Sequence, residues 1–158
     1  MKLAGKIEIA APAERVWVLI NDPISLAGCV PGVQDVRQID DRTFGGSITA
    51  AVGPMEGRFE FSAVIERSDF PADLVVEMTG VDSVTRSTLV ASIGTSLEFV
   101  DADRTTLVYT ATINVKGRLA ILGDMILRAT ASVMISELVK CLRSRLEPAA
   151  GAGTGARP

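Results

Sequence analysis

The pattern of hydrophobic and polar positions separates an alternating part of the chain from a helical part. At the start, residues 2–10 place Ile7 and Ile9 on one face and Lys6 and Glu8 on the other. A period of two is typical of a β-strand with one buried face. We therefore predict a strand over residues 2–10.

Two short helices are predicted directly after this strand. Pro12 stands where the first position of a helix belongs, because proline has a suitable φ and no N–H to satisfy there. The residue before Pro23 avoids helical geometry, so the first helix is expected to end at that point. Residues 24–30 leave room for one or two helical turns before Pro31 and Gly32 force a loop.

The period remains two between residues 33 and 116, which predicts six further strands. Clusters of turn-forming residues separate these strands. The clearest turns fall at 40–42, 53–54, 70–73 and 101–103. Consecutive strands joined by short turns indicate an antiparallel meander. With the first strand, the chain is expected to form seven.

The period changes to that of a helix over residues 118–147. This stretch contains no proline and a single interior glycine, Gly123. We predict one continuous helix of about 45 Å, at 1.5 Å per residue. Its apolar stripe consists of Leu127, Met134, Leu138 and Cys141.

These elements predict an α+β fold in which a curved antiparallel sheet of seven strands wraps around a long C-terminal helix. The sheet must bury one apolar face, and the long helix is the only partner large enough to cover it. The two short helices are expected to close one end. One domain is predicted over residues 1–147. A disordered tail, rich in small residues, is predicted over residues 148–158.

The charge distribution argues against nucleic-acid binding. The chain has 158 residues and a net charge of −3, and residues 1–117 hold 10 basic and 16 acidic side chains, a net charge of −6. Nucleic-acid affinity depends on neutralising phosphates with basic side chains. Only residues 118–147, with a net charge of +2, suit an anionic surface. No apolar run approaches the roughly 18 residues that a membrane span needs.

The sequence offers little for catalysis or for metal binding. The chain has no histidine, which removes the commonest general base and the commonest transition-metal ligand together. No serine or cysteine has a plausible base beside it. We therefore predict no catalytic residue, no metal site and no enzyme activity. The acidic candidates fall mostly on predicted loops or outward faces: Asp22, Glu66, Asp69, Asp82 and Glu98.

The two cysteines, Cys29 and Cys141, lie far apart and lack the spacing of a metal site. The first residues alternate between charged and apolar side chains, which is unlike a signal peptide. We interpret both cysteines as reduced thiols in a cytoplasmic protein, since disulfides are rare in that compartment.

Several motifs carry a family resemblance, and the block over residues 21–32 is the most specific of them. They are Ala-Pro-Ala-Glu at 11–14, Val-Trp at 16–17, Leu-Ile-Asn-Asp-Pro at 19–23, Leu-Ala-Gly-Cys-Val-Pro-Gly at 26–32, Val-Gly-Pro-Met-Glu-Gly-Arg-Phe at 52–59, Lys-Gly-Arg-Leu-Ala at 116–120 and Leu-Gly at 122–123. With these motifs the chain resembles the CoxG family, named for an accessory subunit of carbon monoxide dehydrogenase. That family lies within the START-like (SRPBCC) superfamily, whose helix-grip fold is also described as START/Bet v 1-like.

The resemblance implies a non-catalytic accessory protein. Members of the family serve molybdenum hydroxylases of the carbon monoxide dehydrogenase type, bind apolar lipid-like molecules such as quinones, and link the enzyme to the membrane. For this chain it implies a bound quinone or lipid in place of a fixed cofactor, a hydroxylase partner, and peripheral contact with the inner face of the cytoplasmic membrane. Members often carry a longer C-terminal extension with an anchor, whereas this chain stops at Pro158. The alternatives are a docking or assembly module for the same enzyme that carries no ligand, and a START-like cyclase or hydrolase.

An apolar cavity between sheet and helix is the site that the resemblance implies. The inward face mixes large and very small side chains, and this pattern also fits a filled core. The predicted lining residues are Val30, Phe44, Ile48, Phe59, Phe61, Met78, Ala91, Ile93, Tyr109, Leu127 and Met134.

A few other side chains have two interpretations each. Tyr109, the only tyrosine, either satisfies a local hydrogen bond or meets a quinone carbonyl or a lipid head group. Trp17 is interpreted as a packing anchor between helix and sheet, with stacking on a ligand as the alternative. Ile121 and Met125 lie toward the charged side of the helix. They are either covered by a neighbouring loop or form an exposed rim that docks on a membrane or an enzyme.

Overall fold

Seven strands form one antiparallel sheet in the computed structural model, which describes residues 1–148. The strands run in the order β1-β7-β6-β5-β4-β3-β2, so the first strand of the chain pairs with the last. The predicted seven-stranded antiparallel sheet is therefore confirmed. The bounds are β1 (Lys2–Ile9), β2 (Val33–Gln38), β3 (Thr43–Val52), β4 (Met55–Asp69), β5 (Asp73–Asp82), β6 (Ser87–Asp101) and β7 (Arg104–Lys116).

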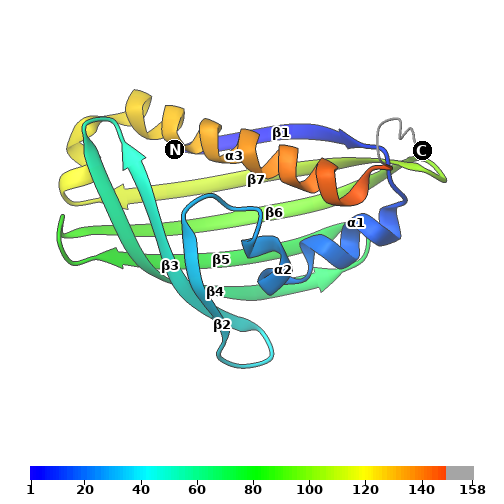
Figure 1. The fold of residues 1–158 in the computed structure, drawn as a ribbon, viewed down its shortest axis with the longest axis horizontal. Coiled ribbons are helices and arrows are strands. Elements are labelled where there is room, and N and C mark those ends of the chain that lie inside the picture. Colours follow the sequence, from blue (N-terminus) through cyan, green and yellow to red (C-terminus); the bar gives the residue numbers. More distant parts are fainter. Residues whose placement is uncertain (149–158) are drawn as a thin grey trace.

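The helices lie on one face of this sheet, and the long one runs roughly along the strands (Figure 1). They are α1 (Ala13–Ile20), α2 (Pro23–Ala27), the short 3-10 helix η1 (Arg118–Leu122) and α3 (Asp124–Leu146). The two short helices after the first strand are thus confirmed. Pro12 lies one position earlier than predicted, because it caps α1 with extended backbone geometry instead of starting the helix.

The prediction of one continuous helix over residues 118–147 is wrong at its start. Gly123 has φ +91°, a left-handed conformation that side chains with a Cβ rarely adopt, so the helical ladder is interrupted there. The chain forms η1 first, turns at Gly123, and only then begins α3. The predicted tail falls outside the described residues except for Pro148.

The strand pairing places one apolar row of side chains across five strands. Phe44 on β3 lies opposite Ala63 on β4, which lies opposite Met78 on β5. Met78 pairs in turn with Ala91 on β6, and Ala91 with Ile113 on β7. Because side chains alternate between the faces of a strand, this row lies on the face that α3 covers.

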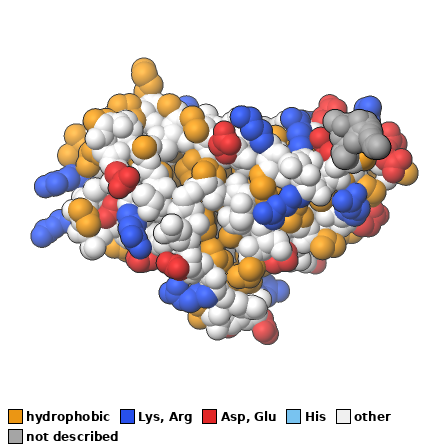
Figure 2. Space-filling model, viewed as in Figure 1, with side chains coloured by type: hydrophobic (Ala, Val, Ile, Leu, Met, Phe, Trp, Pro, Cys, Tyr) orange, Lys and Arg blue, Asp and Glu red, His pale blue; other side chains and the backbone are white. Residues whose placement is uncertain are grey.

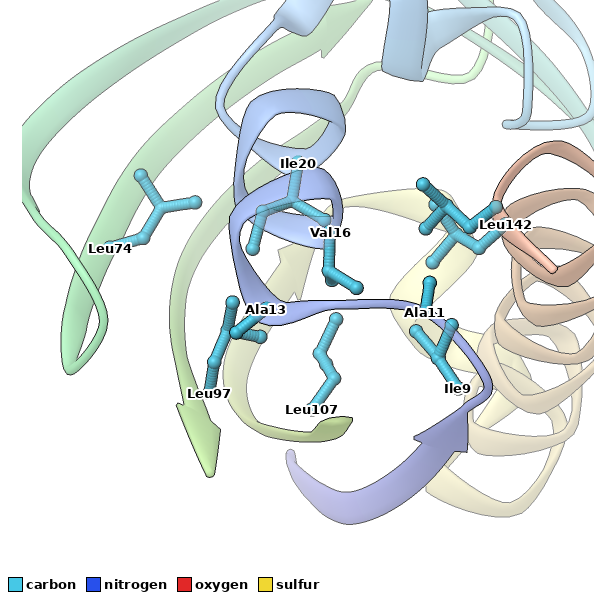
Figure 3. Packing of buried hydrophobic residues seen from close by; sticks show 10 residues of the cluster. Ile9, Ala11, Ala13, Val16, Ile20, Leu74, Leu97, Leu107 and Leu142 are labelled. Atoms are coloured by element: carbon cyan, nitrogen blue, oxygen red, sulfur yellow. The ribbon is translucent and has the colours of Figure 1, made fainter. Parts of the chain in front are cut away.

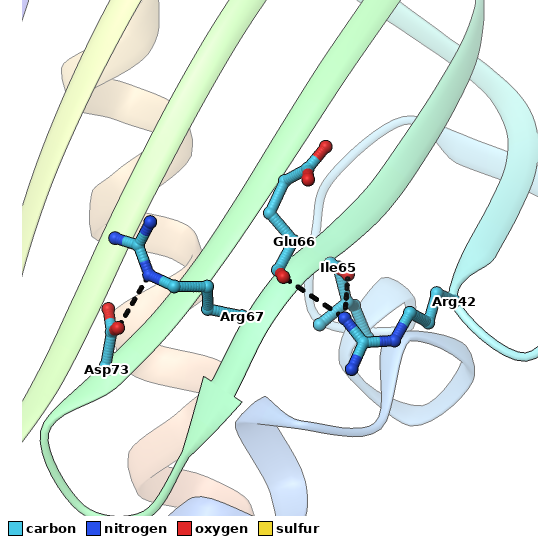
Figure 4. A network of polar contacts seen from close by, with 5 residues as sticks. All are labelled: Arg42, Ile65, Glu66, Arg67 and Asp73. Carbon is cyan, nitrogen blue, oxygen red and sulfur yellow. Dashed lines mark hydrogen bonds and ion pairs between the residues drawn. The ribbon is translucent and has the colours of Figure 1, made fainter.

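A β-bulge in β4 is held by an arginine from the neighbouring turn. The pairing of β4 with β5 shifts between Ile65 and Arg67. Nη1 of Arg42 donates hydrogen bonds to the carbonyl oxygens of Ile65 and Glu66, each over 3.1 Å (Figure 4). Beside it, Arg67 and Asp73 form an ion pair of 2.6 Å across the β4–β5 hairpin. A bulge leaves carbonyl groups outside the ladder, and Arg42 supplies their donor.

The larger hydrophobic core lies at the end of the sheet where α1 packs (Figure 3). Ile9 and Val16 are almost completely buried there, and Leu107 and Leu142 bring in β7 and α3. The buried hydroxyl of Thr105 donates a 2.8 Å hydrogen bond to the carbonyl oxygen of Ala11. This bond fixes the connection between β1 and α1 against β7.

A second, smaller core closes the opposite end of the sheet. Val52, Phe59 and Leu119 are its buried members. Ser87 supports it, because its hydroxyl accepts a hydrogen bond of 3.1 Å from the backbone N–H of Leu119 in η1. Asp82 is also buried at this end, where its carboxylate binds backbone N–H groups. Each end of α3 thus packs against the sheet through a separate core.

Candidate functional site

The middle of the sheet lies between the two cores and is packed less completely than either of them. Along β6, for example, Leu89 packs on the smaller core and Leu97 belongs to the larger one. Between them, Ile93 belongs to neither cluster and is only half-buried. Along α3, the corresponding gap separates Leu127 from Leu138, about 16 Å at 1.5 Å per residue.

The predicted lining residues divide between this middle zone and the cores. Phe59 belongs to the smaller core, Ile48 and Leu127 pack against it, and Tyr109 packs against the larger core. The remaining predicted residues belong to neither core: Val30, Phe44, Phe61, Met78, Ala91, Ile93 and Met134. Of these, only Phe44 and Ala91 are buried, and the other side chains keep part of their surface accessible. We call this set, with Ala63, the central zone.

Helix α3 crosses the face of the sheet that carries the central zone (Figure 1). Its backbone comes close to β3 and to β1, whereas the central strands β4, β5 and β6 lie further away. Small side chains at Ala63 and Ala91 alternate with Phe44 and Met78 in the same row. Figure 2 shows hydrophobic atoms in the middle of this face, between α3 and the strands β2 and β3. Sites for apolar molecules are lined mainly by hydrophobic side chains, and this row has that composition.

The segment over residues 22–32, which we call the α2 segment, lies next to α3 over this face (Figure 1). Asp22 caps α2, because its carboxylate accepts hydrogen bonds from the backbone N–H and the hydroxyl of Ser25. None of the five residues of α2 is buried. Gly32 has φ +82°, and a Cβ there would overlap the carbonyl oxygen of Thr49.

The two cysteines form a disulfide that joins the α2 segment to α3. The Cα atoms of Cys29 and Cys141 are 5.3 Å apart, within the usual range for a disulfide. The prediction of two reduced thiols is therefore wrong. A separation of 112 residues along the chain carried no signal that the fold brings the two together.

A second connection between the same two elements comes from Arg145, which the sequence did not single out. Its Nη1 donates a 2.7 Å hydrogen bond to the carbonyl oxygen of Ser25. Gly28 leaves room for the guanidinium, since a Cβ there would lie 2.7 Å from Nη2 of Arg145. An arginine near the end of a helix is ordinarily explained by the helix dipole, so the sequence offered no sign of this role.

Two surface hollows lie elsewhere, at the α1 end of the molecule. One, of about 750 Å³, lies between the start of α1 and the β6–β7 turn and is lined by Pro12, Arg15 and Asp103, among others. The other, of about 400 Å³, lies between α1 and the end of α3 and includes Val18 and Arg145. None of the predicted lining residues borders either hollow. Both hollows are bordered by charged side chains, whereas the residues of the central zone are all apolar.

The two aromatic residues with alternative interpretations, Tyr109 and Trp17, lie in different parts of the molecule. The ring of Tyr109 lies over Gly5 of β1, where a Cβ would be 2.7 Å from the tyrosine hydroxyl. Trp17 meets Phe70 edge to face at 5.5 Å between ring centroids, and Phe70 meets Phe99 in the same way at 6.1 Å. Edge-to-face pairs are a favourable packing arrangement. They support the interpretation of Trp17 as a packing anchor.

The apolar residues around the start of α3 differ in exposure. Leu122 packs against the smaller core beside Gly53 of the β3–β4 hairpin. By contrast, Ile121 is 82% exposed and Met125 is 85% exposed. Figure 2 shows hydrophobic atoms gathered at this end of the molecule, with Lys and Arg side chains projecting below them.

At the same end of the molecule, backbone hydrogen bonds hold the buried carboxylate of Asp82. Asp82 is 1% exposed, and its carboxylate accepts hydrogen bonds from the backbone N–H groups of Arg58, Val84 and Thr85. Burial acts to raise the pKa of Asp82, but the hydrogen bonds from Arg58 and Thr85 outweigh it and hold the pKa below its usual value. The group therefore stays ionised and fixes the β5–β6 turn.

Two structural tests concern metals and membranes. Within residues 1–148, no group of three or more His, Cys, Asp or Glu side chains is placed to hold a metal ion. No helix in that part of the chain is long and apolar enough to cross a membrane.

A protein-family model matches most of the chain. The family model for CoxG, a subunit of carbon monoxide dehydrogenase, matches residues 5–147. The match confirms the resemblance that the sequence motifs indicated. It covers the α2 segment, α3 and all of the sheet except the first three residues of β1. A comparison of the sequence with curated proteins gives no match.

Solved structures with the same architecture confirm the predicted fold. A conserved protein from Geobacillus kaustophilus has a TM-score of 0.84 and is 21% identical, over 92% of this chain and 94% of that one. A START superfamily protein from Mycobacterium smegmatis has a TM-score of 0.67 at 15% identity, over 92% and 97%. The ZhuI aromatase/cyclase from Streptomyces sp. R1128 has a TM-score of 0.68 at 14% identity, over 99% of each chain. The chain thus has the START-like helix-grip fold.

Proposed function

Because this chain belongs to the CoxG family, we propose that it is a non-catalytic accessory protein that carries an apolar quinone or lipid. The molecule would lie in the central zone, between α3 and the middle of the sheet. The protein would bring it to, or collect it from, a molybdenum hydroxylase of the carbon monoxide dehydrogenase type. The family description supports this class of partner.

The observation that carries the proposal is the incomplete burial of the central zone. In a filled core, side chains such as Phe61, Met78 and Ile93 would be buried, yet all three are half-buried in the middle of a sheet covered by a helix. Met134 is also half-buried, and it lies on the same stripe of α3 as Leu127 and Leu138. Methionine side chains are flexible enough to adapt to ligands of different shape.

Apolar contact alone would supply enough affinity for a carrier. Each Å² of apolar surface removed from water contributes about 25 cal/mol, so burying a few hundred Å² of an isoprenoid or acyl chain contributes several kcal/mol. The central zone offers no buried charge to the ligand, since the row from Phe44 to Ile113 is entirely apolar. Selectivity would then depend on shape and on hydrogen bonds at the edge of the zone, for which Tyr109, between the zone and the larger core, carries a hydroxyl.

Mass spectrometry of the protein extracted under native conditions tests the proposal directly. We expect a quinone or lipid to copurify, and added menaquinone or ubiquinone to raise the melting temperature. Ala63→Phe should abolish both effects, because Ala63 lies between Phe44 and Met78 in the apolar row. Val64→Phe is the matched control, since the neighbouring side chain points to the opposite face of β4.

The same pair of variants separates a carrier from a docking module. If the protein only recruits a hydroxylase, Ala63→Phe and Val64→Phe should both retain capture of the enzyme, and neither should copurify with a ligand. Absence of any bound quinone or lipid in the wild type, together with an unchanged melting temperature, would count against the carrier function.

Membrane contact is the second part of the proposal, and it rests on the exposed rim formed by Ile121 and Met125. Exposed apolar side chains beside cations favour the surface of a membrane with anionic lipids. Arg86, Lys116 and Arg118 are exposed close to this rim, where Gly117 lies against the backbone of Arg86. A peripheral contact there would place the smaller core, and not the α2 segment, toward the lipid.

A further inference from the structure

The disulfide between Cys29 and Cys141 joins α3 to the α2 segment, which is loosely packed and borders the central zone. Within α2 no residue is buried, and only Leu26 packs against the larger core. Cys29 follows two positions after the end of α2 and, at 5% exposed, is the one buried residue of the α2 segment. Val30, which is half-buried, comes next to it and is one of the predicted lining residues.

The other attachments of the α2 segment are few and polar. Arg145 binds the carbonyl oxygen of Ser25, and the carbonyl oxygen of Gly32 accepts a 3.0 Å hydrogen bond from the backbone N–H of Thr49. Segments with little apolar contact and exposed hydrogen bonds open at low free-energy cost. Without the disulfide, the stretch between Asp22 and Gly32 would keep mainly these bonds and the contact of Leu26.

We propose that Cys29 and Cys141 form a reversible redox latch that controls opening of the α2 segment. In the oxidised protein the disulfide holds the segment on α3. A dithiol reduces it in two exchange steps: one thiolate attacks a sulfur of the pair to form a mixed disulfide, and the second thiolate displaces the remaining cysteine. Two protein thiols and one oxidised dithiol result, so two electrons pass from the dithiol to the protein.

The position of the pair is suited to exchange. Cys29 is buried, whereas Cys141 on α3 is half-buried and leaves that side of the pair accessible. In a reducing compartment, where the sequence interpretation placed this chain, a disulfide is usually transient or redox-sensing. A disulfide that joins a weakly packed segment to the helix spanning a binding zone is in a position to set access to that zone. This consequence for the ligand rests on the proposed function, whereas the latch itself does not.

Hydrogen exchange followed by mass spectrometry tests the latch on the full chain without any ligand. The protein is compared after oxidation with diamide and after reduction with dithiothreitol, with alkylation to count free thiols in each sample. We expect amides within residues 22–32 to exchange about tenfold faster or more in the reduced form. Amides of α1 and β5 should be unchanged. The Cys29→Ser variant should reproduce the reduced pattern and should no longer respond to either reagent.

Three results would overturn the latch. They are free thiols that persist after oxidation, unchanged exchange within residues 22–32, and faster exchange throughout the sheet, which would indicate general destabilisation. Cys141→Ser provides a second variant if Cys29→Ser fails to fold, and chemical reduction of the wild type requires no variant.

Transfer of menaquinone-4 to acceptor vesicles separates this inference from the carrier function. The latch predicts faster release from the reduced protein than from the oxidised one. If neither form binds the quinone but residues 22–32 still respond to reduction, the latch is supported and the carrier function is overturned. If both forms bind and release it equally and the exchange pattern does not change, the latch alone is overturned.

Discussion

Arg145 of α3 donates its hydrogen bond to the carbonyl oxygen of Ser25 across 120 positions of the sequence, over 2.7 Å. The guanidinium occupies the space that Gly28 leaves open. With the disulfide between Cys29 and Cys141, this bond makes the end of α3 the main attachment of the α2 segment. The stability of that segment should therefore depend on side chains of α3 more than on its own packing.

Arg145→Ala should loosen the α2 segment with little effect on the whole fold. A single exposed hydrogen bond to a charged group is lost, so the free energy of unfolding should fall by about 1 kcal/mol or less. Hydrogen exchange within residues 22–28 should nevertheless become faster. Arg143→Ala is the matched control, because Arg143 binds the carbonyl oxygen of Glu8 on β1 instead. Equal effects of both variants on residues 22–28 would contradict this role.

Asp82→Asn should destabilise the protein by about 2 kcal/mol near neutral pH, since it weakens hydrogen bonds to a buried carboxylate. The pKa of Asp82 is held below the ordinary value of 3.8, so its stabilisation is complete well above that pH and is lost as the pH falls through the lower folded value. The difference between wild type and variant in chemical denaturation should therefore shrink below about pH 4.

The control for Asp82 is Asp40, which also binds backbone N–H groups in a turn but is exposed. Hydrogen bonds from Arg42 and Thr43 likewise lower the pKa of Asp40. Asp40→Asn should have a clearly smaller effect because water replaces the lost bonds. A pH-independent effect of Asp82→Asn would show that its charge is not what stabilises the turn.

Truncations along α3 should distinguish the core from the central zone. Leu142 is 2% exposed within the larger core, so Leu142→Ala should cost about 3 kcal/mol in the free energy of unfolding. Met134 is half-buried and belongs to neither core, so Met134→Ala should cost about 1 kcal/mol or less. Met134→Ala should, however, weaken quinone binding. A cost equal to that of Leu142→Ala would mean that the zone is a filled core.

The rim at the start of α3 should determine membrane binding. Fully burying one large apolar side chain contributes about 1.5–3 kcal/mol, so changing Ile121 and Met125 together to serine should lower binding to phosphatidylglycerol-rich vesicles about tenfold or more. Val133→Ser is the control, because Val133 is 63% exposed on the same helix but away from the rim. Cosedimentation measures the effect. Equal binding of both variants would locate any membrane contact elsewhere.

The strands were predictable because their signal is local. Side chains of β1 and of the first part of β4 alternate in exposure, so a period of two marks these strands without knowledge of their neighbours. The short turns between them then left the meander as the simplest arrangement. The bulge in β4 was not predictable, because it depends on Arg42 reaching the carbonyl oxygens of Ile65 and Glu66 from another turn.

The helical part was predicted less completely. The change of period after Lys116 is clear, but the period gives no sign that the helix is interrupted at Gly123, whose positive φ separates η1 from α3. Of the predicted lining residues, those nearest the ends of the sheet, such as Phe59 and Leu127, lie in or against a core. The period shows which side chains face inward, but it does not show how closely α3 approaches them.

The sequence by itself determined the order of elements, the inward face of each strand and the family. All three depend on patterns within short stretches of chain. Only the tertiary structure decided that the inward face is packed at its two ends and left half-buried in the middle, that Cys29 meets Cys141, and that Arg145 meets Ser25. Those features depend on where a helix lies relative to a sheet and on contacts between residues more than a hundred positions apart, for which no local pattern exists.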